Sequence, residues 1–161
     1  MVLITVERSW SARPDSLAEA RAHDTQIVSE VRTTLERKTI DWLRHHDFAN
    51  SWLWARTDGL YELGRLDNVE HKPIDAKLAE RLRALFDSTA ELTAALTQHG
   101  FPDDRRGDFM NIGWSPAEMD VLEGDERELF DARRVLLNTR ADAVAEAYDA
   151  LIDLARQKLL L

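Results

Sequence analysis

Three long stretches of this sequence carry apolar residues at the spacing of an α-helix, and they constrain the fold more than any other feature. In the first stretch, apolar side chains recur from Leu17 to Trp42 at intervals close to a heptad. The second begins at Ile74 and the third at Met119. Each such helix buries one apolar stripe against its neighbours. We therefore expect a mainly α protein, an antiparallel bundle of these three long helices plus a short one at residues 48–56.

Capping signals mark the ends of two of these helices. Pro73, with Asp75 in the first turn, predicts the start of the second helix, and Gly100 predicts its end. For the third helix, Ser115 and Glu118 have the spacing of a capping box, with a proline at the first helical position. The third helix is therefore expected to begin at Ser115.

The length of the third helix limits the architecture. An unbroken helix over residues 116–160 would be about 67 Å long, whereas a globule of this size is only about 40 Å across. The helix must therefore break, for which Gly124 is the expected place, or project and pack against a second copy. Because the chain ends in the apolar run Leu159, Leu160 and Leu161, we expect a homodimer.

The start of the chain predicts a small β element. Residues 2–6, Val-Leu-Ile-Thr-Val, are dense in β-branched side chains and favour a short strand. Since a lone strand leaves its edges unpaired, it needs a partner. Residues 109–114 alternate in polarity and could supply one, and residues 60–63 are a weaker candidate. The sequence contains no repeat or linker, so we expect one helical-bundle domain over residues 1–161.

Charge and composition exclude several kinds of partner. The sequence has 30 acidic and 21 basic residues and a formal net charge of −9, whereas duplex nucleic acid is bound by clustered Lys and Arg. It has no cysteine, which excludes disulfides and thiolate nucleophiles and favours a reducing compartment. No apolar run reaches the roughly 18–20 residues of a membrane span. We expect a cytoplasmic protein that binds neither duplex nucleic acid nor a membrane.

The motifs that usually mark catalytic and metal sites are missing. The sequence has no nucleophile elbow, no Gly-rich phosphate loop and no Glu-x-x-His spacing, so no catalytic residue, cofactor or metal site is expected. Asp41 and His45 share a helix face at i and i+4, but histidine is also favourable at a helix end without any ligand. The loop at residues 103–108 combines acids with arginines, and we expect a solvated turn there. Enzymatic activity stays open, and its absence is favoured.

Aromatic residues are concentrated in one segment. Trp42, Phe48, Trp52 and Trp54 lie within 13 residues. Trp is enriched at binding hot spots, which favours a docking surface, but the same rings could fill the irregular end of a bundle. On a helix, Trp52 and Trp54 would be about 200° apart and could not both face one core. We therefore expect one of the two near solvent.

A second segment is strongly acidic. Seven acids and one base lie between Glu118 and Asp131. Acids in the first turn of a helix complement its dipole, but that effect fades within a turn and does not explain the acids from Asp125 onward. The segment is expected to be either a solvated helix face or a surface for a basic partner. In the second case, binding should weaken steeply with salt.

Together these observations favour a non-catalytic protein-interaction module of the inhibitor, immunity or adaptor type, whose partner is a protein with a basic surface. The residues expected to contact the partner are Trp52, Trp54, Glu123, Glu126 and Glu128. The alternative is a small-molecule-binding protein or enzyme with an aromatic pocket within the bundle. That pocket would be lined by Trp42, His45, His46, Phe48, Trp114 and Tyr148.

Overall fold

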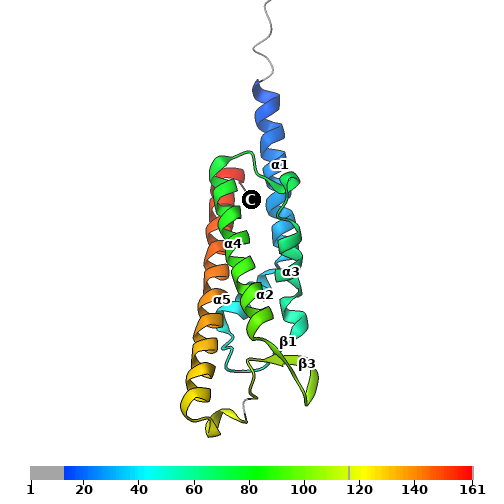
Figure 1. The fold of residues 1–161 in the computed structure, drawn as a ribbon. Coiled ribbons are helices and arrows are strands. Elements are labelled where there is room, and N and C mark those ends of the chain that lie inside the picture. Colours follow the sequence, from blue (N-terminus) through cyan, green and yellow to red (C-terminus); the bar gives the residue numbers. More distant parts are fainter. Residues whose placement is uncertain (1–12, 116, 161) are drawn as a thin grey trace, which may run out of the picture.

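Five α-helices and a small antiparallel sheet form the part of the chain that the computed structural model describes, residues 13–115 and 117–160 (Figure 1). The helices are α1 (Arg13–Thr34), α2 (Arg37–His45), α3 (Asp58–Arg65), α4 (Ala76–His99) and α5 (Gly124–Leu159). The short 3-10 helices are η2 (Trp54–Thr57), η3 (Val69–His71) and η4 (Met119–Val121). The strands β1 (Trp52–Leu53), β2 (Phe101–Asp103) and β3 (Arg106–Asn111) pair in the order β1-β3-β2. The prediction of a mainly α protein is confirmed.

The helices α4 and α5 run side by side in opposite directions along the molecule, with α1 and α3 beside them (Figure 1). The apolar stripe predicted for α4 is buried, as Leu78, Leu85 and Leu92 illustrate. Asp75 caps this helix, because its carboxylate accepts hydrogen bonds from two backbone N–H groups of the first turn at 2.9 and 3.0 Å. Gly100 follows the last residue of the helix. The predicted end at Gly100 is confirmed, whereas the helix begins at Ala76, three residues after the predicted start at Pro73.

The first predicted helix is in fact two helices, and the prediction of one helix from Leu17 to Trp42 was wrong. α1 ends at Thr34 and α2 begins three residues later, with extended backbone at Glu36 between them. A Cβ on Gly59 would lie 2.7 Å from the Thr34 carbonyl oxygen, so the start of α3 passes directly beside the end of α1. Apolar spacing continues from α1 into α2, and for this reason it does not reveal the break.

The last helix begins later than its capping signal predicts. The predicted contacts do form, since the backbone N–H and the hydroxyl of Ser115 donate to the Glu118 carboxylate at 2.7 and 2.8 Å. Only the single turn η4 follows them, and α5 begins at Gly124, where φ is +54°. The expected break at Gly124 is confirmed. α5 still has 36 residues, about 54 Å, but neither it nor another described helix is apolar enough to cross a membrane.

The sheet differs from the predicted β element in its partners. β3 shares only residues 109–111 with the segment predicted as a strand, since it begins at Arg106 and ends at Asn111. It pairs with β1 and β2, with Trp52 opposite Met110 and Phe101 opposite Asn111. Residues 60–63 belong to α3, so that candidate strand was wrong. Residues 48–56 contain β1 and the start of η2 and form no α-helix. Residues 2–6 lie outside the described residues.

Candidate functional site

The predicted Trp-rich segment forms a packed cluster. The ring of Phe48 lies 5.8 Å from that of Trp42 and 5.0 Å from that of Trp52, both edge to face, and Phe48 and Trp52 are almost completely buried. The Trp54 ring is 41% exposed and lies 5.4 Å from the ring of Tyr61 on α3. One of the two tryptophans is therefore near solvent, as expected. Trp42, Phe48 and Trp52 fill the end of the bundle with rings.

His46 lies among these rings, and its surroundings affect its charge. Its ring centroid is 4.9 Å from that of Phe48 and 5.0 Å from that of Trp42, and its Nε2 has no hydrogen-bond partner among the described residues. Burial lowers the pKa of His46, against smaller opposing effects from Asn50 and Asp47. The adjacent His45 is exposed. Within residues 13–115 and 117–160, no group of three His, Asp or Glu side chains could hold a metal ion.

Asp47 holds the aromatic cluster onto α5. Its carboxylate accepts hydrogen bonds from the Nε and one Nη of Arg134, at 2.9 and 2.5 Å, and from the Asn138 amide at 3.1 Å. The Asn138 oxygen in turn accepts from the backbone N–H of Phe48 at 3.0 Å. The hydrogen bonds from Arg134 hold the pKa of Asp47 far below its usual range, with help from Ala49 and Asn138. Each group of this network has a structural partner, so it connects the segment after α2 to α5.

The six residues of the predicted aromatic pocket lie in separate environments. Trp42, His46 and Phe48 share the packed cluster, whereas His45 is exposed. Tyr148 is 4% exposed on α5, and burial raises the pKa of its hydroxyl. Trp114 packs on Phe130, at 6.1 Å between ring centroids, and lines a hollow elsewhere. Sequence proximity therefore did not identify the residues that surround a cavity.

The hollow beside Trp114, which we call the hairpin hollow, has a volume of about 650 Å³. Its walls come from the β2–β3 hairpin, residues 113–115, Glu118 and α5. Asp103 is buried at the hairpin turn, where it accepts from the Arg105 backbone at 3.0 Å and from the Arg106 guanidinium at 3.1 Å. The rest of this loop is exposed. The predicted turn exists, but an acid buried in it fixes its shape.

Arg133 is the central side chain of the hairpin hollow, and no motif in the sequence marks it. Its guanidinium lies between two rings, 5.3 Å from the centroid of Phe101 and 5.4 Å from that of Trp114. One Nη donates to the Ile112 carbonyl at 2.9 Å, and the buried Nε has no hydrogen-bond partner among the described residues. Gly113 has φ +105°, and a Cβ there would lie 2.7 Å from the Arg133 Nη1. The chain therefore needs glycine beside this arginine.

Exposed apolar and acidic side chains lie around the hairpin hollow. Phe101 is 41% exposed and Leu129 is 45% exposed, and both line it. The three predicted acids Glu123, Glu126 and Glu128 are exposed at the start of α5, and none of them forms an ion pair with another described residue. Leu129 follows Glu126 by three residues and precedes Arg133 by four, so all three share one face of α5. Glu126 thus lies on the face of α5 that borders the hollow, whereas Glu128 lies about 200° round the helix from it. Trp52 and Trp54 belong to the sheet and η2.

No family model matches this chain, and neither does any curated protein or solved structure. The geometry of the hairpin hollow and of its rim therefore has to support any assignment of function.

Proposed function

We propose that this protein is a non-catalytic inhibitor, immunity or adaptor protein that binds a basic segment of a partner protein at the hairpin hollow. The observation that carries this proposal is the exposure of Phe101 and Leu129 at the rim of a hollow of about 650 Å³. Covering such side chains with a partner's apolar anchor gains roughly 25 cal/mol per Å² of apolar surface removed from water. Exposed apolar groups that gather at a concave site are typical of interaction sites.

The charge around the hollow favours a basic partner. Glu123, Glu126 and Glu128 are exposed carboxylates without an ion pair among the described residues. A lysine or arginine next to the partner's apolar anchor would approach Glu126, which shares a face of α5 with Leu129 and Arg133. Such complementarity raises the association rate and selects against acidic partners, and both effects weaken with salt. The net charge of the whole chain, −9, adds a long-range attraction for the same basic partner.

The contact residues in this proposal differ from those expected from the sequence. Trp52 is 2% exposed in the aromatic cluster, so its ring is not available to a partner. Trp54 packs on Tyr61 beside α3 and does not line the hairpin hollow. Phe101, Trp114 and Leu129 take their place as the apolar contacts. The acids Glu123, Glu126 and Glu128 remain in the set.

The proposal can be tested with a minimal basic peptide. We would titrate the ¹⁵N-labelled protein with a blocked Lys-Lys-Phe-Lys-Lys peptide and follow the backbone amides and the Trp114 indole N–H by NMR. Saturable shifts are expected at Phe101, Trp114 and Leu129, because these residues line the hollow. A peptide with Ala for Phe should bind more weakly, and one with Glu for Lys should not bind.

A charge-matched pair of variants separates a local site from a general charge effect. Glu126→Lys with Glu128→Lys should weaken the basic peptide about tenfold or more at low salt. Asp142→Lys with Glu146→Lys makes the same change in net charge at exposed positions farther along α5 and should have a much smaller effect. Equal losses in the two variants, or no loss in either, would contradict the proposal.

A further inference from the structure

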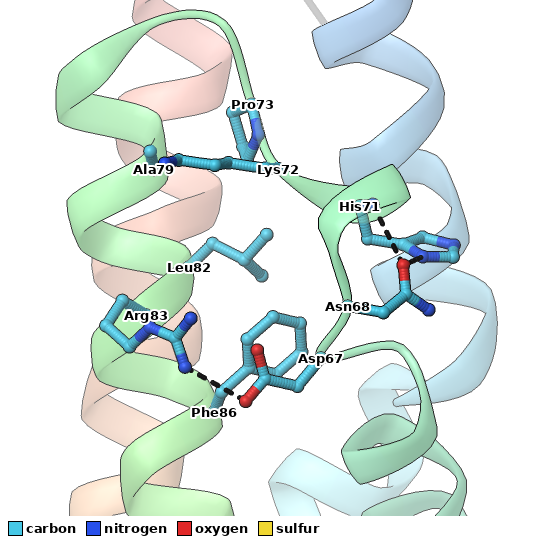
Figure 2. Close-up of a pocket in the computed structure, with 9 residues that line it drawn as sticks. All are labelled: Asp67, Asn68, His71, Lys72, Pro73, Ala79, Leu82, Arg83 and Phe86. Atoms are coloured by element: carbon cyan, nitrogen blue, oxygen red, sulfur yellow. Dashed lines mark hydrogen bonds and ion pairs between the residues drawn. The ribbon is translucent and has the colours of Figure 1, made fainter.

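A second cavity lies on another part of the bundle, between α4 and the segment that connects α3 to α4. This cleft has a volume of about 600 Å³, within the range of small-molecule sites. Figure 2 shows Leu82 and Phe86 pointing into it from α4, and His71 and Asn68 on the opposite side. Lys72 extends towards Ala79 at its upper end (Figure 2).

The cleft exists because the connecting segment is fastened to α1 before the chain enters α4. The buried carboxylate of Asp24 on α1 accepts hydrogen bonds from the backbone N–H groups of Ile74 at 2.7 Å and Asp75 at 3.0 Å. His23, also on α1, contacts the Lys72 carbonyl at 3.2 Å. These contacts fix residues 72–75 at one end of the cleft.

His71 fixes the opposite wall. Its Nε2 lies 2.8 Å from the Glu30 carboxylate and its Nδ1 lies 2.9 Å from the Asn68 side-chain oxygen. That oxygen also accepts from the Glu70 backbone N–H at 2.9 Å, which identifies it as the oxygen end of the amide. A hydrogen bond from the Gln26 amide has the largest effect on Glu30 and lowers its pKa. His71 lowers it further by a smaller amount. Since both ring nitrogens have partners, His71 shapes the wall and leaves ligand contacts to other groups.

The lining of the cleft has two cations, Lys72 and Arg83, and one acid, Asp67, whereas the chain as a whole is acidic. Lys72 is exposed and forms no ion pair with another described residue. Arg83 pairs with Asp67 at 2.9 Å across the mouth of the cleft, with side chains that are 60% and 37% exposed. Exposed pairs of this kind contribute little net stability, so Arg83 can exchange Asp67 for a ligand. The cleft therefore offers two cations to an anion in a protein of net charge −9.

The inner wall of the cleft is apolar. Leu82 is 3% exposed, Phe86 is 6% exposed, and Pro73 is buried beside them. Figure 2 places Leu82 between Lys72 and Arg83, with Pro73 next to Lys72 and Phe86 next to Arg83. A ligand that uses the whole cleft therefore has an apolar body for Leu82 and Phe86 and an anionic group for the two cations.

We propose that this cleft binds a small organic carboxylate with a flat apolar body. The carboxylate lies between Lys72 and Arg83, where each cation donates a charge-assisted hydrogen bond. The apolar body lies on Leu82 and against the ring of Phe86. This site shares no residue with the hairpin hollow, so it does not depend on the interaction proposed there.

The test uses 2-naphthoate as the probe and 2-naphthamide as a neutral control of the same shape. Titration of the ¹⁵N-labelled full chain should give saturable shifts at Lys72, Ala79, Arg83 and Phe86 with naphthoate. The amide analogue should bind about tenfold more weakly, because it cannot form the charge-assisted contacts. Naphthoate binding should also weaken with added salt.

Matched variants test each half of the site. Lys72→Gln should weaken naphthoate about tenfold, whereas Lys77→Gln, an exposed position on the first turn of α4 outside the cleft, should leave it unchanged. Ala79→Leu adds volume to the half-buried wall without removing a core contact and should weaken both probes. Thermal unfolding of each variant verifies that it remains folded.

Several results would overturn this inference. The first is equal affinity of the protein for naphthoate and naphthamide. The second is a set of shifted amides that lies away from α4. The third is a Lys72→Gln variant that binds naphthoate as tightly as the unaltered chain does. Absence of saturable shifts at millimolar naphthoate in the unaltered chain would overturn it as well. These outcomes are independent of the basic peptide, whose shifts are expected at the hairpin hollow.

Discussion

Two groups of aromatic side chains in this protein differ in what separates their rings. In the cluster of Trp42, Phe48 and Trp52, the rings meet edge to face at 5.0 and 5.8 Å and the central ring is completely buried. At the hairpin hollow, the guanidinium of Arg133 lies between Phe101 and Trp114, more than 5 Å from each ring centroid. The first group is core, and the second lines a cavity.

This difference shows that a segment rich in aromatic residues need not expose its rings to a partner. Rings that are close in sequence can pack on one another, and close packing removes them from solvent. At the hairpin hollow a planar cation lies over both rings, and Phe101 stays 41% exposed beside it. The more informative feature of this molecule is therefore one arginine contributed by a distant helix. The following substitutions probe the two groups, from the largest expected effect to the smallest.

Removal of a ring should distinguish the two groups most strongly. Phe48→Ala empties a completely buried site and should lower the free energy of unfolding by about 3–5 kcal/mol. Phe101→Ala removes a ring that is 41% exposed and should cost about 1 kcal/mol or less. Urea denaturation of both variants provides the comparison. Similar losses would mean that the hairpin hollow is as tightly packed as the cluster.

The glycine beside Arg133 should be the next most sensitive position. Gly113→Ala forces a side chain into a backbone with φ +105° and against the guanidinium, so we expect a loss of about 1–3 kcal/mol. Gly107→Ala is the matched control on the same hairpin, because a Cβ there meets nothing within 4 Å. It should change stability by about 0.5 kcal/mol or less. Chemical denaturation measures both, and an unchanged Gly113→Ala would show that Arg133 is free to move.

The Asp47 network should make stability depend on acid. Because Arg134 and its neighbours hold the pKa of Asp47 below its usual 3.8, the stabilisation is present above that pH and is lost as pH falls below it. Asp47→Asn should cost about 1–2 kcal/mol at neutral pH, since the side chains of Asp47 and Arg134 are partly exposed. It should also flatten the acid dependence below about pH 4. Asp104→Asn, at an exposed hairpin position, should neither lower stability at neutral pH nor change its acid dependence. Denaturation of the two variants over a range of pH measures both effects.

The smallest effect concerns His46. Burial lowers its pKa below the usual 6.5, so the unfolded chain takes up a proton first as pH falls and the native state loses stability below that pH. His46→Phe should reduce the fall in unfolding free energy between about pH 7 and pH 5. NMR titration of the His46 ring should give a midpoint below 6.5. A midpoint above it would mean that the effects of Asn50 and Asp47 outweigh that of burial.

Sequence patterns predicted elements well where a helix packs on one neighbour. The stripe from Leu78 to Leu96 and the end at Gly100 describe α4 correctly, because apolar spacing and capping are local properties. The predicted start at Pro73 was three residues early, and Ile74, the first residue of the predicted stripe, is exposed. The same reasoning failed after Thr34, where the close approach of Gly59 accompanies a break. It also failed after Ser115, where a correctly formed capping pair is followed by only one turn.

For the hairpin hollow, the sequence indicated the charge but not the cavity. Glu123, Glu126 and Glu128 are exposed as expected, because a run of acids at a helix start is a local feature. Arg133 carried no signal, since its partners Phe101 and Trp114 are 32 and 19 residues away in the chain. The homodimer expected from the apolar end stays a prediction.

The sequence by itself determined that the chain is mainly helical, that α4 ends before Gly100, and that the start of α5 is acidic. It also indicated Gly124 as the place where the last helix is interrupted, which is where α5 begins. These properties depend on residues within a few turns of one another. Only the tertiary structure decided that Trp52 is core, that Arg133 separates two rings and that Lys72 and Arg83 border a cleft. Each of these depends on contacts between distant segments, which local spacing does not encode.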